Sequence, residues 1–123
     1  MGNGSAFRAG TFGEYVTVKY IAGVRVITKK GSPRKSENTP MYSHSEKTMY
    51  ARRDAKTGKV TQIAVYDNHR KIKDIEWGHK HGKFEVGQVH VQEYIDGKRQ
   101  PEAREPTAEE LRLANKIMEA DSE

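Results

Sequence analysis

Two alternating runs joined by a short polar turn constrain the fold of this chain more than any other feature. Residues 59–66 (KVTQIAVY) are rich in β-branched side chains, and residues 71–77 (KIKDIEW) follow after the polar segment 67–70 (DNHR). Alternation with a period of two is typical of β-strands, and a four-residue polar loop between two such runs predicts a hairpin. Four further segments are predicted as strands: 14–20, 24–28, 46–53 and 84–95. In the last of them the alternation changes phase at Gly87, which predicts a β-bulge.

The C-terminal part of the chain contains the one helix that the sequence predicts. Thr107 and Glu110 form a capping box, and an apolar stripe follows it: Leu111, Leu113, Ala114, Ile117 and Met118. Because such a stripe must be buried, we expect the helix to cover part of the sheet. The predicted fold class is α+β, a twisted, mainly antiparallel sheet of five or six strands with one C-terminal helix packed on it. Residues 1–12 are predicted to be a flexible N-terminus and residues 13–123 a single domain.

Charge and composition narrow the classes of function. Lys and Arg number 22 against 17 Asp and Glu, a net charge of +5, and acids dominate from Pro101 to the end of the sequence. A basic body favours a polyanionic partner, although a solvated surface without a partner is the plain alternative. The chain has no cysteine, which excludes disulfides, thiolate metal sites and cysteine catalysis. This agrees with the predicted cytoplasmic location, and equally with a domain that must cross a membrane unfolded. No run approaches the roughly 20 apolar residues of a membrane helix.

Two carboxylates in the predicted strand 71–77 are candidates for chemistry. Period two places Asp74 and Glu76 on one face of this strand together with Ile72, while Ile75 and Trp77 lie on the other. A pair of acids spaced in this way can bind a metal ion or act as a general base. The same pattern is also typical of the solvent-exposed face of an edge strand.

Three of the five histidines lie in the next twenty residues. His79 and His81 belong to a loop bracketed by glycines, and His90 lies on the less apolar face of the following strand. We expect the loop to fold back so that the three rings share one pocket. Two imidazoles can serve as base and acid in cleaving an RNA phosphodiester through the 2′-hydroxyl without a metal or other cofactor. A three-histidine zinc site and exposed histidines without a role are the alternatives.

Basic and aromatic residues near these positions suit a nucleic acid. Three basic residues are predicted to stabilise charge on a phosphate: Arg53, Lys80 and Lys83. Four more lie at or near the start of the polar segment 29–45, which is either a phosphate-binding loop or disordered: Lys29, Lys30, Arg34 and Lys35. Five aromatic residues can stack on unpaired bases or belong to the core: Tyr42, Tyr50, Tyr66, Trp77 and Tyr94.

Residues 66–79 (YDNHRKIKDIEWGH) resemble a segment of the C-terminal toxin modules of bacterial polymorphic toxin systems and of phage-associated proteins. In that segment a tyrosine-aspartate turn leads to an acid-apolar-acid strand, a histidine-glycine loop and a further strand with histidine. Five residues stand at comparable places: Asp74, Glu76, His79, His81 and His90. Here the second acid is a glutamate, and the usual proline-histidine-x-histidine ending is reduced to residues 89–92 (VHVQ). The resemblance implies a small α+β nuclease-like domain encoded by a mobile or phage element.

The sequence therefore favours a metal-independent ribonuclease-like toxin module. His81 and His90 are the predicted acid/base pair, and Asp74 or Glu76 is predicted to orient one of them. The predicted partner is a nucleic acid, with RNA favoured; a protein inhibitor is a further candidate partner, and no membrane partner is expected. The alternatives are a non-catalytic phage or mobile-element protein that binds nucleic acid or a protein, and a metal-dependent nuclease.

Overall fold

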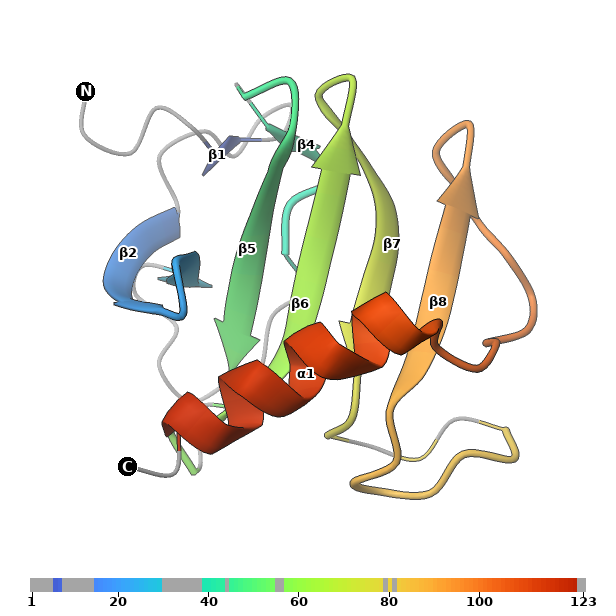
Figure 1. Ribbon diagram of the computed structural model, residues 1–123. Coiled ribbons are helices and arrows are strands. Elements are labelled where there is room, and N and C mark those ends of the chain that lie inside the picture. Colours follow the sequence, from blue (N-terminus) through green and yellow to red (C-terminus); the bar gives the residue numbers. More distant parts are fainter. Residues whose placement is uncertain are drawn as a thin grey trace.

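The computed structural model describes residues 6–7, 15–29, 39–43, 45–54, 57–78, 80 and 82–121, which form nine strands and one helix (Figure 1). The strands are β1 (Ala6–Phe7), β2 (Tyr15–Ile21), β3 (Val24–Lys29), β4 (Tyr42–Ser43), β5 (Thr48–Arg53), β6 (Val60–Asp67), β7 (Arg70–Glu76), β8 (His90–Ile95) and β9 (Lys98–Arg99). The helix is α1 (Ala108–Asp121). The predicted α+β fold class is confirmed, with a mainly antiparallel sheet and the C-terminal helix packed on it. There are more strands than the expected five or six, because β1, β4 and β9 have two residues each, too few for a periodic pattern.

The strands are joined in the order β1-β4-β7-β6-β5-β3-β2, and β8 pairs with β7 and β9. Among the described strands every pair is antiparallel except β3 and β5, which run parallel. Of residues 1–12, expected to be flexible, only β1 belongs to the described part of the chain. Within that described part, no helix has the length and apolar character that crossing a membrane requires.

Two-residue turns close three of the hairpins. The turns are Ala22-Gly23, Asn68-His69 and Asp96-Gly97, and both residues of each have positive φ. Such turns match the right-handed twist of the strands that they join. The predicted loop 67–70 is shorter than expected, because Asp67 and Arg70 pair with each other as the last residues of β6 and the first of β7.

The predicted long strand 84–95 is wrong in its first half. β8 begins only at His90, and the preceding residues form a turn in which the Gln88 amide donates to the Glu85 carbonyl at 2.9 Å. Gly87 has a φ of 89°, and its amide donates to the carbonyl of Trp77 at 2.7 Å. The change of phase at Gly87 therefore marks a turn held against the end of β7, and not a bulge within a strand.

Helix α1 crosses one face of the sheet diagonally (Figure 1). Its Ala114 and Ile117 are buried in the main core, which the sheet completes with residues from six strands: Ile21, Val24, Val26, Ala51, Val60, Ile63, Ile75 and Val91. The predicted capping box is confirmed: the Thr107 amide donates to Glu110 Oε1 at 2.8 Å, and the Glu110 amide donates to Thr107 Oγ1 at 3.2 Å. Leu111 was expected in the buried stripe but is 40% exposed, and Glu110 is buried beside it.

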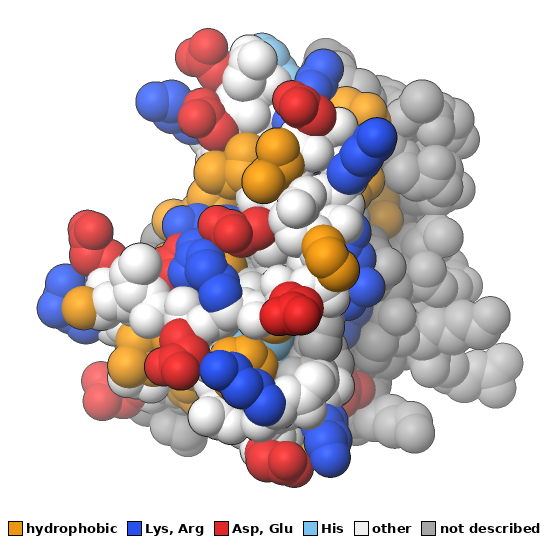
Figure 2. Space-filling view, turned by 90° about the vertical axis from the view of Figure 1, so that its right-hand side faces the viewer, with side chains coloured by type: hydrophobic (Ala, Val, Ile, Leu, Met, Phe, Trp, Pro, Cys, Tyr) orange, Lys and Arg blue, Asp and Glu red, His pale blue; other side chains and the backbone are white. Residues whose placement is uncertain are grey.

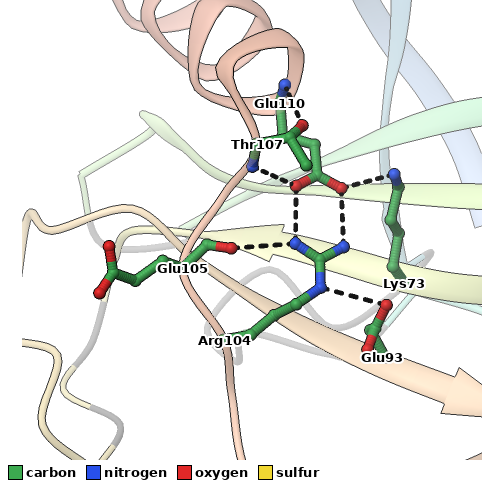
Figure 3. Close-up of polar contacts among 6 residues, drawn as sticks. All are labelled: Lys73, Glu93, Arg104, Glu105, Thr107 and Glu110. Atoms are coloured by element: carbon green, nitrogen blue, oxygen red, sulfur yellow. Dashed lines mark hydrogen bonds and ion pairs between the residues drawn. The ribbon is translucent and has the colours of Figure 1, made fainter.

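The buried carboxylate of Glu110 joins the helix to the sheet (Figure 3). Arg104 donates to both of its oxygens at 2.9 and 3.0 Å, and Lys73 of β7 donates to Oε2 at 2.6 Å. Arg104 also contacts Glu93 of β8 at 3.1 Å, and its backbone pairs with Val91. These donors, the Arg104 guanidinium foremost, hold the pKa of Glu110 far below its usual range.

We predict that Glu110→Gln destabilises the fold by about 2–3 kcal/mol at neutral pH, because a neutral amide cannot replace a carboxylate that accepts from two cations. A depressed folded-state pKa stabilises the protein above the ordinary glutamate value of about 4.3, and this contribution is lost as the pH falls below it. The difference between wild type and variant in urea unfolding should therefore shrink in acid. Glu109→Gln, in the same turn but exposed, is the control. An equal difference at both pH values would contradict the assignment.

We also predict that Ala22→Gly stabilises the protein by up to about 1 kcal/mol. Ala22 is exposed and has a φ of 50°, a conformation that costs an L-residue with a Cβ atom but not glycine. Urea unfolding should show the gain, and Ala22→Val, which is β-branched, should show a loss. A destabilised Ala22→Gly variant would contradict the turn assignment.

Candidate functional site

The two faces of the sheet differ in chemistry. The core residues that point toward α1 are apolar, and Lys73 and Glu93 of the Glu110 network lie beside them. The opposite side of strands β5–β8 has polar and ionisable side chains, and we call this side the polar face. Strand register aligns four of them as neighbours across four strands, and we call them the polar row: Arg52, Gln62, Glu76 and His90. The adjacent row on the same face is Tyr50, Ala64, Asp74 and Gln92. Neighbouring side chains in such rows point the same way and interact.

A bulge in β7 decides which of its residues belong to the polar face. The register with β6 shifts between Lys73 and Lys71, so Ile72 is an extra residue of β7. Asp74 and Glu76 share the polar face, as alternation predicted. Strict alternation would have placed Lys71 on the α1 side, but the bulge brings it to Asp74, with Nζ at 3.3 Å from Oδ1.

Glu76 and His90 form a contact pair at the end of the polar row. His90 Nε2 lies 3.3 Å from Glu76 Oε1, and Gln62 Nε2 donates to Glu76 Oε2 at 3.1 Å. The other ring nitrogen of His90 lies 3.1 Å from the Gln88 carbonyl oxygen, and the ring stacks on Phe84 at 5.3 Å. Both ring nitrogens therefore face acceptors, and an imidazolium can donate to both. His90 is 0% exposed, whereas the Glu76 side chain is 12% exposed, so the carboxylate is the part of this pair that reaches the surface.

Lys71, Asp74 and Tyr94 form a second group on the polar face. Lys71 and Asp74 are each 2% exposed, and the Tyr94 hydroxyl donates to Asp74 Oδ2 at 3.0 Å. Lys71 Nζ also lies 5.2 Å from the centre of the Tyr94 ring. Burial lowers the pKa of Lys71 and raises the pKa of Asp74, and the charge of each residue opposes the shift of the other. Burial likewise raises the pKa of Tyr94, which keeps its hydroxyl protonated as a donor.

Three of the five predicted catalytic residues are described, and all three lie on the polar face: Asp74, Glu76 and His90. His79 and His81 lie outside the described residues, so the convergence of three imidazoles stays a prediction. In the described part of the chain, no three His, Cys, Asp or Glu residues are grouped so as to hold a metal ion.

None of the predicted phosphate-binding residues whose side chains the structure describes belongs to the polar row. Lys30, Arg34 and Lys35 lie outside the described residues, and of Lys29 only the backbone is described. Lys80 and Lys83 are exposed and lie near acids, with Nζ at 3.7 Å from Glu85 and 3.8 Å from Glu105. Figure 2 shows cationic and anionic side chains intermixed over the side of the molecule that lies on the right in Figure 1. Such exposed pairs contribute little to stability, and both lysines can exchange their partners.

Neighbouring arginines at the end of β5 lie on opposite faces. Arg53, predicted to contact a phosphate, pairs with Val60, a residue of the core beneath α1. Arg52 pairs with Gln62 and so belongs to the polar row. Of these two arginines, the register therefore places Arg52 on the same face as Glu76 and His90.

Three of the aromatic residues considered for base stacking are core residues. Tyr50, Tyr66 and Trp77 are buried, and each places its polar atom on an internal partner. Of the two alternatives for these three residues, base stacking or a position in the core, the core position is therefore confirmed. Tyr42 is exposed and Tyr94 is half-buried.

No protein-family model, curated protein or solved structure significantly matches this chain. The geometry of the polar face is therefore what indicates a site. Sequence reasoning missed five of its residues: Arg52, Gln62, Lys71, Gln92 and, as a partner of Asp74, Tyr94. Alternation along β5 and β6 was a usable signal for Arg52 and Gln62, but no sequence signal marks the bulge that brings in Lys71.

We predict that Gly78→Ala destabilises the protein by about 1–3 kcal/mol. Gly78 begins the loop after β7, and a Cβ atom there would lie 2.5 Å from Thr61 Cβ and 2.7 Å from its methyl group. Urea unfolding measures the loss. In the background of Thr61→Gly, which removes both contacting atoms, the same substitution should cost far less. An equal cost in both backgrounds would show that this close approach is not the cause.

Proposed function

We propose that the polar face is an active site that cleaves RNA phosphodiester bonds without a metal ion. The observation that supports this most is the polar row, in which a guanidinium, an amide, a carboxylate and an imidazole stand on four adjacent strands. Cleavage through the 2′-hydroxyl needs a base, an acid and a cation for the phosphate, and these residue types supply such chemistry. The net charge of +5 favours a polyanionic substrate.

The spacing of the row suits a phosphate with its ribose. Neighbouring strands lie roughly 4.8 Å apart, so the backbones of Arg52 and Glu76, two strands apart, are separated by roughly 10 Å. Gln62, which stands between them, is 2% exposed, so a phosphate would bind at the edge where the Glu76 carboxylate reaches the surface, with the long arginine side chain extending toward it. A guanidinium can bind two phosphate oxygens at once.

In the proposed reaction Glu76 is the catalytic base, because its carboxylate reaches the surface. It takes the proton of the 2′-hydroxyl while the 2′-oxygen forms a bond to phosphorus and the bond from phosphorus to the 5′-oxygen breaks. His90 lies behind Glu76 and contacts it, so we assign it as a positioning residue. The 5′-oxygen receives its proton from His81, the predicted partner in acid/base chemistry, which lies outside the described residues. Arg52 offsets the charge that develops on the phosphate. The products are a 2′,3′-cyclic phosphate and a 5′-hydroxyl.

A non-catalytic protein that binds nucleic acid or a protein partner is the second candidate. Lys71, Asp74 and His90 are almost fully shielded from solvent and contact neighbouring polar groups, an arrangement that a purely structural polar cluster would also have. The likeness to toxin modules and phage-associated proteins is compatible with either function, and for both we propose a cytoplasmic location.

The test is cleavage of a fluorescent single-stranded RNA in the presence of a chelator. We predict turnover with a bell-shaped pH profile, because the reaction needs an ionised carboxylate and a protonated imidazole. Glu76→Gln and His81→Ala should each lower the rate by about 10²–10⁴-fold, and Arg52→Gln by about 10²–10³-fold. Arg53→Gln, on the opposite face, and His69→Gln, in a hairpin turn, are matched controls that should retain activity.

Other results would reject the proposal in different ways. Activity that the chelator abolishes would indicate a metal-dependent nuclease. Salt-sensitive RNA binding without turnover would support the binding protein instead. Equal losses for Arg52→Gln and Arg53→Gln would remove the polar row from the site.

A further inference from the structure

The polar face buries an amino group beside a carboxyl group, directly next to the proposed base. Lys71 and Asp74 are each 2% exposed, and Asp74 and Glu76 are two residues apart on the same face of β7. This spacing separates their backbones by roughly 6–7 Å. Both acids therefore lie within electrostatic range of Lys71, and the charge state of Asp74 bears on the surroundings of Glu76.

We propose that Lys71 is a positioning residue that holds Asp74 ionised beside Glu76 and thereby sets the acidic limit of the proposed activity. The inference depends on the proposed function only for its effect on cleavage. Its structural part, that Lys71 controls the proton of Asp74, can be tested by itself.

The contacts of Asp74 support this role. Lys71 Nζ lies 3.3 Å from Asp74 Oδ1 and 3.4 Å from Oδ2, and the Tyr94 hydroxyl donates to Oδ2 at 3.0 Å. With almost no exposure, the carboxylate relies on these two residues in place of water. The bulge at Ile72 is what creates the contact, because an unbroken strand would direct Lys71 toward α1.

The surrounding charges make Lys71 the main group that favours the ionised form of Asp74. Burial raises the pKa of Asp74, the charge of Lys71 is the largest opposing influence, and the charge of Glu76 acts in the same direction as burial. The other titratable or charged groups on the strands around this pair are Arg52 of β5, Tyr66 of β6, and His90 and Tyr94 of β8. Of these, the Tyr94 hydroxyl also lowers the pKa of Asp74, through its hydrogen bond.

Protonation of Asp74 would change the site next to Glu76. A protonated carboxyl group has lost its negative charge and has an O–H donor in place of one acceptor site, so it binds Lys71 and Tyr94 less strongly. Activity requires both carboxylates to be ionised, Glu76 as the base and Asp74 beside it. Because Asp74 is the more deeply buried of the two, we expect the acidic limb of the cleavage profile to follow the protonation of Asp74.

The experiment follows the Asp74 carboxyl carbon by NMR across pH in the wild type, in Lys71→Met and in Lys71→Arg. An opposite charge at this distance shifts a titration by about 1–3 pH units. The Asp74 midpoint should therefore rise by about one pH unit or more in Lys71→Met and stay close to the wild-type value in Lys71→Arg. A role in stability alone would lower the unfolding free energy without moving this midpoint. An unchanged midpoint in folded Lys71→Met would overturn the proposal.

The variant Asp74→Asn tests the same pair through the titration of the Lys71 amine. This test is available even if Lys71→Met does not fold. Asp74 raises the pKa of Lys71 against the effect of burial, so the Lys71 amine should lose its proton at lower pH in Asp74→Asn. An unchanged lysine titration would also overturn the proposal.

The cleavage assay separates this inference from the proposed function. If wild type cleaves RNA, the acidic limb of its pH profile should move upward in Lys71→Met by the same amount as the Asp74 midpoint, and an unmoved limb would overturn the link to activity. If wild type does not cleave RNA, the proposed function fails, and the two NMR titrations still decide whether Lys71 controls the proton of Asp74.

Discussion

The carboxylate of Glu110 connects three parts of the chain that are far apart in sequence. It accepts hydrogen bonds from the start of α1, from Arg104 in the segment after β9, and from Lys73 in β7. Arg104 extends the connection to β8 through Glu93 and through its backbone bridge to Val91. A charge buried in this way is favourable only because every one of its acceptor positions is used. The network therefore defines where α1 lies on the sheet and holds β7 and β8 together from the α1 side.

The same two strands carry the candidate site on their other side. Lys73 and Glu93 are register partners in the network, and the next pair along the strands, Asp74 and Gln92, belongs to the polar face. Because side chains alternate between faces, an interaction that holds β7 and β8 in register on one face also aligns Glu76 with His90 on the other. The pairing of β7 with β8 thus determines both which of their residues enter the apolar core and which belong to the polar face.

The polar face costs desolvation free energy that a cluster with a purely structural role would not need to spend. Burying an amine and a carboxyl group removes both from water, and well-packed apolar residues are often at least as stable as a buried ion pair. Ionisable groups with strongly altered pKa values gather at functional sites, and Lys71 and Asp74 are shifted in opposite directions by burial. Beside them, Glu76 brings a carboxylate to the surface, which a merely structural cluster does not need.

Local patterns in the sequence determined most strands, the hairpin between β6 and β7, the capping box of Thr107 and Glu110, and the shared face of Asp74 and Glu76. These features depend on neighbours a few residues away, so period and turn chemistry suffice to predict them. Only the tertiary structure decided that β8 lies beside β7, that β3 and β5 run parallel, and that Ile72 is an extra residue that turns Lys71 toward Asp74. Register and bulges depend on which strands pair, and on which alignment of those strands buries the most apolar side-chain surface. For that reason the polar row, unlike the individual residues in it, cannot be read from the order of residues alone.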